Sequence, residues 1–433
     1  MKISSGPAAG GVYRYYVLIM LMLTFMFNIT DRMVMSILIE DIKADFALTD
    51  TQIGLLAGAA FTMFYVILGI PAGRLADRTN RKNMVSIAVA LWSLMAALCG
   101  VAVGFWTLFL ARLGVGVGEA GGSPPAVSLI TNYFEPHELS KAMGIYSIGA
   151  VLGPVVGFVA GGLLAEAYGW RWTFIILGLP GVLIGLIIYW TIREPRRGQF
   201  AHDDKPKILP DKQEHFAVTM KSLWSNRIFV RVAISQMLAV TASYAFAIWL
   251  APILIRNYDV PVSQIGIYLG LVWVLGGVPG MILGGYLTDR LAIKNPQWRA
   301  WFCSIVLILA LPLLCFCLLT DNLVLALGLY MVGYGLHSST QGPAISMMQA
   351  SVAPAERGTA SAISSLATTF LGYFVGPAVV GVISDSLSAE HGTLSLNYAV
   401  IAITVISLVP AIFSYSWASK AIKAKSRGAA QAM

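Results

Sequence analysis

Two stretches of the sequence resemble each other, TQIGLLAGAAFTMFYVILGIPAGRLADR at 51–78 and SQIGIYLGLVWVLGGVPGMILGGYLTDR at 263–290, and they align without a gap. Both carry Gln-Ile-Gly after their first residue, and both end in Gly-x-Leu-x-Asp-Arg. A weaker match follows in the same order, because Pro-Ala-x-Ser occurs at 125–128 and again at 343–346. Similar segments that recur in one order indicate an internal duplication. The sequence therefore predicts two equivalent halves.

The composition is typical of a membrane protein. Hydrophobic residues make up 57% and charged residues 12% of the 433 residues, and the mean hydropathy is +0.75. A soluble protein carries about 25% charged residues, so soluble enzymes, nucleic-acid-binding proteins and disordered chains are excluded. We interpret the net charge of +8 as basic residues kept on one side of a membrane. The cysteines lie inside apolar runs and predict free thiols: Cys99, Cys303, Cys315 and Cys317.

Apolar runs long enough to cross a membrane recur along the whole chain. A spanning helix needs about 20 apolar residues, and twelve such runs are present. Six spans in each half make the two repeats parallel, which is the architecture of major facilitator transporters. We therefore predict an all-α membrane protein with twelve transmembrane helices in two parallel six-helix repeats. The predicted spans are 15–38, 51–75, 83–103, 105–131, 139–166, 171–192, 227–254, 263–288, 298–319, 322–349, 357–384 and 395–417.

The loops between the spans alternate in charge. Basic loops stay in the cytoplasm, so both termini and the long 193–226 loop are predicted to be cytoplasmic. The basic set is Arg74, Arg78, Arg81, Lys82, Lys141, Arg193, Arg196, Arg197, Arg290, Lys294, Arg299, Arg357, Lys420, Lys423, Lys425 and Arg427. The acidic set is Glu40, Asp41, Asp45, Asp50, Asp259, Asp321, Asp385 and Glu390.

The long polar segment at mid-chain separates the two halves. Within it Phe216, Met220 and Leu223 recur at i, i+4 and i+7, which predicts a short helix on the inner membrane surface. The predicted domains are an N-terminal six-helix bundle at 14–192, a cytoplasmic linker at 193–226, a C-terminal six-helix bundle at 227–418 and a cytoplasmic tail at 419–433.

A charged motif follows the second span. Gly73, Asp77, Arg78 and Arg81 form Gly-x-Leu-x-Asp-Arg-x-x-Arg, and Asp289 with Arg290 repeats its centre in the second half. Glycine there allows a neighbouring helix to pack closely, and the carboxylate can pair with an arginine and face a helix N-terminus. We predict a gating contact that holds the halves in one state. The alternative is a tight turn with a sidedness signal.

Two charges lie inside the fourth span. Arg112 and Glu119 are seven residues apart and share one helix face, but about 10 Å along the axis separates them. That is too far for a direct bond unless both side chains reach toward each other. Charges within spans are costly and are functional candidates by default, so Glu119 is a predicted proton carrier and Arg112 a substrate-binding residue. The alternative is a static buried ion pair.

The first span carries Asp31 and Arg32 in its outer half. Adjacent helix residues point about 100° apart, so one can face a cavity while the other pairs with another helix. Asp31 is the second predicted proton carrier, and Arg32 is a candidate for binding an anionic head group. The alternative is that both snorkel toward the membrane surface.

The second half supplies mostly aromatic candidates. His337 falls opposite Glu119 in the repeat and can titrate near physiological pH. We select it with Tyr244 and Trp249 as candidate substrate-binding residues. The alternatives are a packed, hydrogen-bonded neutral histidine and aromatic residues that serve packing alone.

Small residues line one face of two further spans. The fifth reads Gly149-x-x-x-Gly153-Pro154, and the eleventh reads Gly372-x-x-x-Gly376-Pro377. This spacing permits close helix approach, and proline kinks the helix. The pattern resembles the antiporter-type motif of facilitator families, from which we assign no direction of transport.

Taken together, these motifs resemble the spinster family within the major facilitator superfamily. The resemblance implies a rocker-switch, proton-coupled carrier with the four charged residues of spans 1 and 4 in its central site. Spinster proteins are associated with export of lysolipids and sphingosine-phosphate-type lipids. The matching positions are Asn28, Asp31 and Arg32; the loop at 73–81; Arg112, Glu119 and Ala120; and Tyr133 with Phe134.

The expected function is therefore proton-coupled export or exchange of an amphiphilic solute by a monomer in the inner membrane. The alternative is a proton symporter of a small organic anion or sugar acid. We expect protons, membrane lipids and a small-molecule or lipid substrate as partners, with no nucleic acid. The sequence holds no paired metal ligands, catalytic dyad or nucleotide-binding loop, so no enzyme activity, metal or cofactor is expected.

Overall fold

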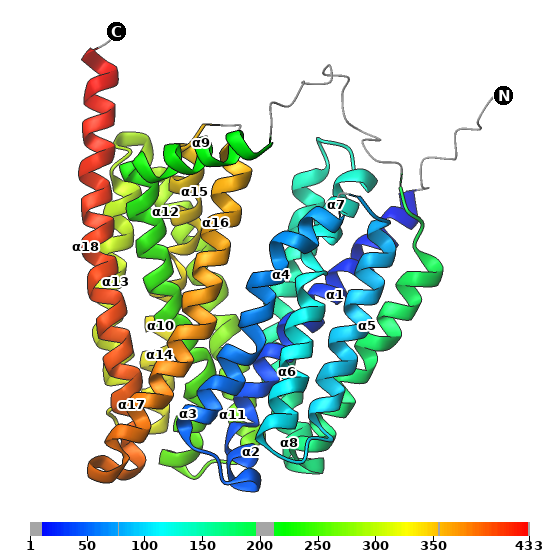
Figure 1. Ribbon diagram of the computed structural model, residues 1–433. Coiled ribbons are helices and arrows are strands. Elements are labelled where there is room, and N and C mark those ends of the chain that lie inside the picture. Colours follow the sequence, from blue (N-terminus) through cyan, green and yellow to red (C-terminus); the bar gives the residue numbers. More distant parts are fainter. Residues whose placement is uncertain (1–10, 77, 196–211, 354–355, 432–433) are drawn as a thin grey trace, which may run out of the picture. The chain divides into compact units, whose positions relative to one another are not determined.

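The computed structural model describes residues 11–76, 78–195, 212–353 and 356–431, and every regular element among them is a helix (Figure 1). Nine helices in this part of the chain are long and apolar enough to cross a membrane. Two of these nine stretches, Leu139–Thr191 and Arg357–Ala424, each cover two predicted spans. The predicted span at 105–131 is divided between two shorter helices. Every predicted span thus falls on helix, and the predicted all-helical membrane fold is confirmed.

The described residues divide into two compact units. The first contains 11–38 and 60–195, and the second contains 39–59 and 212–431. The predicted boundary kept 39–59 with the first bundle, whereas in the structure this segment packs within the second unit. The close backbone approaches that hold it there involve Gly54, Gly58 and Gly381, where an added Cβ would overlap the backbone oxygens of Pro377, Tyr373 and Asp50.

Six helices build the first unit. α8 covers 53 residues and consists of two helices that meet at a kink at Gly169, whose φ of 78° is not helical, so the kink separates the two predicted spans. Its glycine stripe packs against the first helix, since a Cβ on Gly149, Gly153 or Gly157 would come within 3.0 Å of that helix. The helices are α1 (Gly11–Ile37), α4 (Ala60–Ala76), α5 (Arg81–Cys99), α6 (Phe105–Ala120), α7 (Ser123–Tyr133) and α8 (Leu139–Thr191).

The second unit begins with residues 39–59, which contain the loop after the first span and the start of the second span. The elements of that segment are α2 (Ile39–Phe46), α3 (Asp50–Gly54) and the π-helical η1 (Leu55–Ala59). The remaining elements are α9 (Lys212–Ser225), α10 (Arg227–Tyr258), α11 (Val262–Val272), η2 (Trp273–Gly277), α12 (Val278–Lys294), α13 (Trp298–Phe316), α14 (Leu323–Ser338), α15 (Gln341–Ser351), α16 (Arg357–Thr369), η4 (Phe370–Val375), α17 (Gly376–His391), η5 (Gly392–Leu394) and α18 (Ser395–Gln431).

Corresponding helices of the two halves are interrupted at corresponding positions of the internal repeat. In the first unit the break between α6 and α7 falls at Gly121 and Gly122, and in the second the break between α14 and α15 falls at Ser339 and Thr340. These positions correspond in the alignment that pairs Pro125 with Pro343. The duplicated sequence therefore produces a duplicated local structure.

The predicted interfacial helix is α9, which lies crosswise to α10 at the end of the second unit (Figure 1). Leu223 is buried, whereas Val218 and Trp224 are 65% and 69% exposed. The side chain of Phe216 lies outside the described residues. A helix with one apolar face packed and an exposed tryptophan is suited to a membrane surface.

Candidate functional site

Four charged side chains are buried together in the first unit. Asp31 and Arg32 come from α1, and Arg112 and Glu119 come from α6. Their exposed fractions are 4%, 8%, 1% and 0% respectively. We call these four residues the charge cluster. Because Asp31 and Arg32 are buried, the structure argues against the alternative in which both snorkel to the membrane surface.

The direct partner of Glu119 is Arg32 from α1, and not Arg112 from its own helix. Arg32 donates Nε to Oε2 of Glu119 at 2.9 Å and donates Nη2 to the same oxygen. Arg112 instead donates Nη1 to the main-chain oxygen of Asp31 at 3.4 Å. Arg112 and Glu119 lie two helical turns apart on α6 and do not bond to each other. Arg32 from α1 pairs with Glu119 instead.

Several polar atoms of the charge cluster lack hydrogen-bond partners among the residues that the structure describes. They are Oδ2 of Asp31, Nε of Arg112 and Oε1 of Glu119. A buried polar atom without a hydrogen-bond partner costs folding free energy. Ionisable side chains buried in a membrane span are therefore candidates for a function in transport. With both carboxylates ionised, two negative and two positive side chains give the charge cluster no net charge.

Two aromatic rings on α4 border the charge cluster. The Arg32 guanidinium carbon lies 4.5 Å from the ring centroid of Phe61 and 5.1 Å from that of Tyr65. The Arg112 guanidinium carbon lies 5.9 Å from the Phe61 centroid. Neither aromatic residue stands out in the sequence, because an aromatic residue in a membrane span usually serves packing and no sequence spacing relates α4 to α1 or α6.

Glycines of α6 bring α4 and α5 against the helix that carries Arg112 and Glu119. A Cβ on Gly116 would overlap the main-chain oxygen of Phe61, and a Cβ on Gly118 would lie 2.7 Å from the nitrogen of Trp92. The glycines of α6 therefore allow close packing against both neighbouring helices. This close packing fixes the distance between the aromatic residues and the charge cluster.

The candidates in the second unit are all at least partly packed. His337 is 2% exposed and its Nε2 donates to the oxygen of Ala239 at 2.9 Å, since a carbonyl can only accept. Trp249 is 0% exposed and donates Nε1 to the oxygen of Pro377 at 3.1 Å. Tyr244 is half-buried against Tyr373. The contacts of Trp249 are those of a packing residue, which is the alternative that the sequence left open for it.

A second group of charges holds the 39–59 segment within the second unit. Asp50 is 3% exposed and accepts two hydrogen bonds from Arg256, at 2.8 and 3.0 Å. Arg256 also donates to Glu40 at 2.8 and 3.0 Å. Lys43 and Ser384 donate to the Asp50 carboxylate as well. We call these five residues the Asp50 cluster.

The sequence places Glu40 and Asp50 only in the acidic set of loop charges. The signal for a pairing was Arg256, a basic residue in the last turn of α10 at the end where the loops are acidic. Asp385 adds to the attachment, because its carboxylate accepts from the main-chain nitrogens of Asp50 and Thr51 at 3.0 and 2.8 Å.

Residues 20–377, which run from the first span into α17, match the family model described as Major Facilitator Superfamily. The chain belongs to the Major Facilitator Superfamily. This family match, together with relatives that are described as an efflux pump and as a transporter, confirms the expectation of a multi-pass membrane transporter rather than an enzyme.

Three relatives of the superfamily show the range of similarity. The chain is 30% identical over 389 residues to an MFS-type efflux pump of Mycolicibacterium smegmatis, covering 89% of this chain and 88% of the pump. It is 24% identical over 408 residues to the sphingosine-1-phosphate transporter SPNS2 of Danio rerio, covering 89% and 80%. It is 28% identical over 378 residues to protein spinster homolog 1 of Homo sapiens, covering 83% and 71%.

Solved structures agree with the spinster resemblance. A bacterial homolog of the human lysosomal transporter spinster, in an inward-facing and unoccupied conformation, matches with a TM-score of 0.85 and 29% identity, covering 96% of this chain and 98% of that one. The same description in an occupied conformation matches with a TM-score of 0.82. The predicted major facilitator fold and spinster-type membership are therefore confirmed.

The loop motif of this superfamily member lies at the end of α4 and the start of α5. A Cβ on Gly73 or Gly285 would meet no described atom within 4 Å, so no helix of the described residues packs closely against either glycine. Asp77 lies outside the described residues, and Arg78 is exposed.

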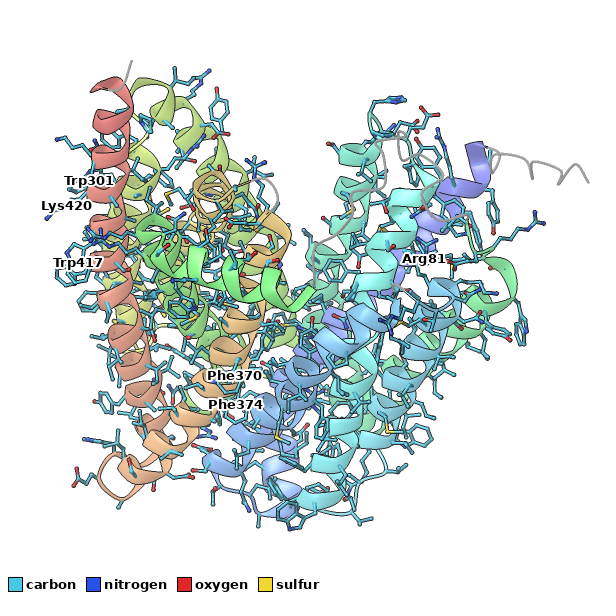
Figure 2. The ribbon with its side chains drawn as sticks, turned by 45° about the horizontal axis from the view of Figure 1, so that its top comes forward. Arg81, Trp301, Phe370, Phe374, Trp417 and Lys420 are labelled. Atoms are coloured by element: carbon cyan, nitrogen blue, oxygen red, sulfur yellow. The ribbon has the colours of Figure 1, made fainter. Side chains whose placement is uncertain are left out.

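Arg81 makes its hydrogen bonds within the first unit. It is 3% exposed and lies at the start of α5 (Figure 2). Its Nε donates to Glu194 at 2.7 Å, and its other nitrogens donate to Ser128 and to the oxygen of Pro195. Arg81 therefore fastens α5 to α7 and to the segment after α8.

In the second unit the repeated motif also pairs locally. Asp289 accepts from Arg299 at 3.3 Å with its side chain 72% exposed. The guanidinium carbon of Arg290 lies 4.5 Å from the ring centroid of Tyr286. The carboxylate thus pairs with an arginine of the next helix, α13, and not with the adjacent Arg290.

Proposed function

We propose that this chain is a proton-coupled secondary transporter that exports or exchanges an amphiphilic solute, such as a lysolipid or a sphingolipid-like molecule, by alternating access. Its spinster-type relatives support the substrate class, one of them being described as a sphingosine-1-phosphate transporter. The description of the Mycolicibacterium smegmatis relative as an efflux pump supports export.

The observation that carries the proposal is the buried pair of Arg32 and Glu119. Oε2 of Glu119 accepts from Arg32, whereas Oε1 is buried and makes no hydrogen bond of acceptable geometry among the described residues, with the side chain of Asn28 as a further polar neighbour of the carboxyl group. A proton can therefore add to Oε1 while Oε2 keeps its contact. We assign proton coupling to Glu119 and to Asp31, whose Oδ2 is likewise buried without a partner in the described part of the chain.

The substrate's two ends would contact different kinds of residue. Arg32 and Arg112 supply the positive charge for an anionic head group. In the second unit, Tyr244 and His337 remain candidates for the rest of the molecule. Phe370 and Phe374 on η4, which stack with centroids 5.1 Å apart (Figure 2), add apolar surface there, and Phe370 is 41% exposed.

We further propose that the protein is a monomer in the inner membrane with both termini in the cytoplasm. Trp301 on α13 and Trp417 on α18 are exposed near Lys420, at the end of the second unit where α18 continues toward the C-terminus (Figure 2). Tryptophan and lysine are enriched where a helix leaves the membrane. The basic loops support the cytoplasm as the compartment at this end.

Gating is proposed to use charges at both ends of the spans. At the end with basic loops, the motif residues Gly73, Asp77, Arg78 and Arg81, with Asp289 and Arg290 in the second half, are the candidates. At the end with acidic loops, the Asp50 cluster fastens residues 39–59, which include the start of the second span, within the second unit. Opening of that end would require the Asp50 cluster to separate.

The experiment is reconstitution into liposomes with an imposed pH gradient, using a fluorescent lysophosphatidic acid as probe. The parent should move the probe faster with the gradient than without it, and Glu119→Gln should abolish that difference. Unlabelled lysolipid should compete with the probe, and gluconate should not. Transport by Glu119→Gln that is as fast and as pH-sensitive as the parent would overturn the assignment of Glu119.

The charge balance of the cluster favours a second candidate, a proton symporter of a small organic anion. When one carboxylate takes a proton, the cluster gains a net positive charge and attracts an anion. Proton and anion would then load together and move in one direction. Competition by gluconate in place of lysolipid would select this alternative.

A further inference from the structure

Two aromatic rings border the charge cluster, and the proposed function gives neither of them a role. Phe61 and Tyr65 lie one turn apart on α4 and stack with their centroids 5.5 Å apart. Phe61 is 1% exposed, and the guanidinium carbons of Arg32 and Arg112 lie 4.5 and 5.9 Å from its centroid. Arg32 therefore contacts a carboxylate and two ring faces at once.

These contacts respond differently to a proton. The bonds from Arg32 to Glu119 weaken when the carboxylate becomes neutral, since charge-assisted hydrogen bonds are about twice as strong as neutral ones. The attraction of a guanidinium to a phenyl ring depends on the ring quadrupole, which does not titrate. The attraction between the Arg32 guanidinium and the ring also strengthens when the Glu119 carboxylate is neutral and no longer offsets the positive charge of Arg32. The ring contact is thus worth more in the protonated state of Glu119.

We propose that Phe61 is a positioning residue that holds the guanidinium of Arg32 in place while Glu119 changes its protonation state. The same guanidinium can then exchange the carboxylate of Glu119 for the anionic group of a substrate without leaving its site. This inference rests on the proposed function, because it assumes that Glu119 takes up and releases a proton during transport.

Main-chain packing between α4 and α6 holds the ring of Phe61 close to the charge cluster. Gly116 lies between Arg112 and Glu119 on α6, and a Cβ there would overlap the main-chain oxygen of Phe61. α4 and α6 therefore meet at the residue that carries the ring. The position of Phe61 relative to Glu119 is set by main-chain contact, which a change in protonation leaves unaltered.

Other titratable groups surround the pair and have to be separated from it. Asp31 is the one that could reproduce a pH effect, because it is the second carboxylate of the charge cluster, and the variant Asp31→Asn removes it. The groups are Asp31 and Arg32 from α1, Tyr65 from α4, Cys99 from α5, Arg112 from α6 and Tyr146 from α8.

The test is a double-mutant cycle on the thermal stability of the full chain in detergent, which needs no substrate. Phe61→Leu is compared in the parent and in Glu119→Gln, where residue 119 is always neutral. We expect the loss of Tm caused by Phe61→Leu to be about 1–2 °C larger in the Glu119→Gln background. Phe61→Tyr, which keeps a ring, should restore most of the loss in both backgrounds.

Phe246 provides a matched control. It is 2% exposed and stacks on Tyr330 with centroids 5.3 Å apart, much as Phe61 stacks on Tyr65, but it lies in the second unit. Phe246→Leu should lower Tm equally in both backgrounds. If Phe61→Leu also lowers Tm equally in both, Phe61 is only a packing residue and the proposal is overturned.

A pH titration keeps the test decisive if Glu119→Gln does not fold. The loss of Tm caused by Phe61→Leu should then grow in the parent as pH falls, and should still grow in the Asp31→Asn background. If the decrease in Tm caused by Phe61→Leu is the same at every pH, the positioning role is overturned, but the proposal of proton-coupled transport is unaffected. Conversely, transport that ignores the pH gradient overturns the proposed function without altering the result of the cycle.

Discussion

Arg32 of α1 donates both Nε and Nη2 to a single oxygen of Glu119, a residue 87 positions later on α6. The other carboxylate oxygen is buried without a hydrogen-bond partner in the described structure. One oxygen therefore holds the arginine, and the other can accept a proton. This division between the two oxygens of one side chain underlies the first two predictions.

Neutralising residue 119 should uncouple transport from protons. In Glu119→Gln the amide oxygen can still accept from Arg32, but the side chain cannot titrate, so we expect the dependence of transport on pH to be lost. The measurement is probe uptake into liposomes at several external pH values. Glu138→Gln is the matched control, since Glu138 pairs with Arg14 outside the charge cluster, and it should keep the pH profile of the parent.

Replacing Arg32 by lysine should weaken binding of an anionic probe although the charge is kept. Lysine cannot present two parallel donors or a planar face to the rings. Loss of one charge-assisted hydrogen bond of about 1.5–3 kcal/mol corresponds to roughly a tenfold to hundredfold weaker affinity. Arg171→Lys is the control, because Arg171 lies 4.2 Å over Trp170 away from the cluster. Equal affinities for parent and Arg32→Lys would contradict the assignment.

Removing Arg256 should loosen the attachment of residues 39–59. Arg256 and Asp50 have side chains only 12% and 4% exposed, and breaking a buried pair costs on the order of 3–5 kcal/mol. In Arg256→Gln we expect amide hydrogen exchange across 39–59 to accelerate by roughly a hundredfold to a few thousandfold. Arg299→Gln breaks an exposed pair worth at most about 1 kcal/mol and should leave exchange in 39–59 unchanged.

Two glycine substitutions should have opposite effects on stability. Gly116→Ala forces a Cβ into the main-chain oxygen of Phe61, and overpacking of this kind costs about 1–3 kcal/mol. Gly73→Ala meets open space and should stabilise α4 by about 0.5–1 kcal/mol. Thermal unfolding of the two variants in detergent measures the contrast. A lower Tm for Gly73→Ala would restore the close packing first predicted there.

Much of the fold is a local property of the sequence. The length of each apolar run, the charge of each loop and the repeat between 51–78 and 263–290 are all readable along the chain. They determined that the protein is a duplicated bundle of membrane helices. They also singled out Asp31, Arg32, Arg112 and Glu119, because charge within a span is rare enough to be conspicuous.

Which side chains meet was decided by the tertiary structure alone. Helical periodicity relates residues on one helix, so it could compare Arg112 with Glu119 but could not bring Arg32 or Phe61 to them from other helices. Hydropathy likewise assigned 39–59 to the first half by chain position, whereas the Asp50 cluster fixes that segment within the second unit. Hydropathy and residue spacing are properties of one continuous segment of the chain. A contact between two helices depends on which of their faces pack together, and only the tertiary structure determines that.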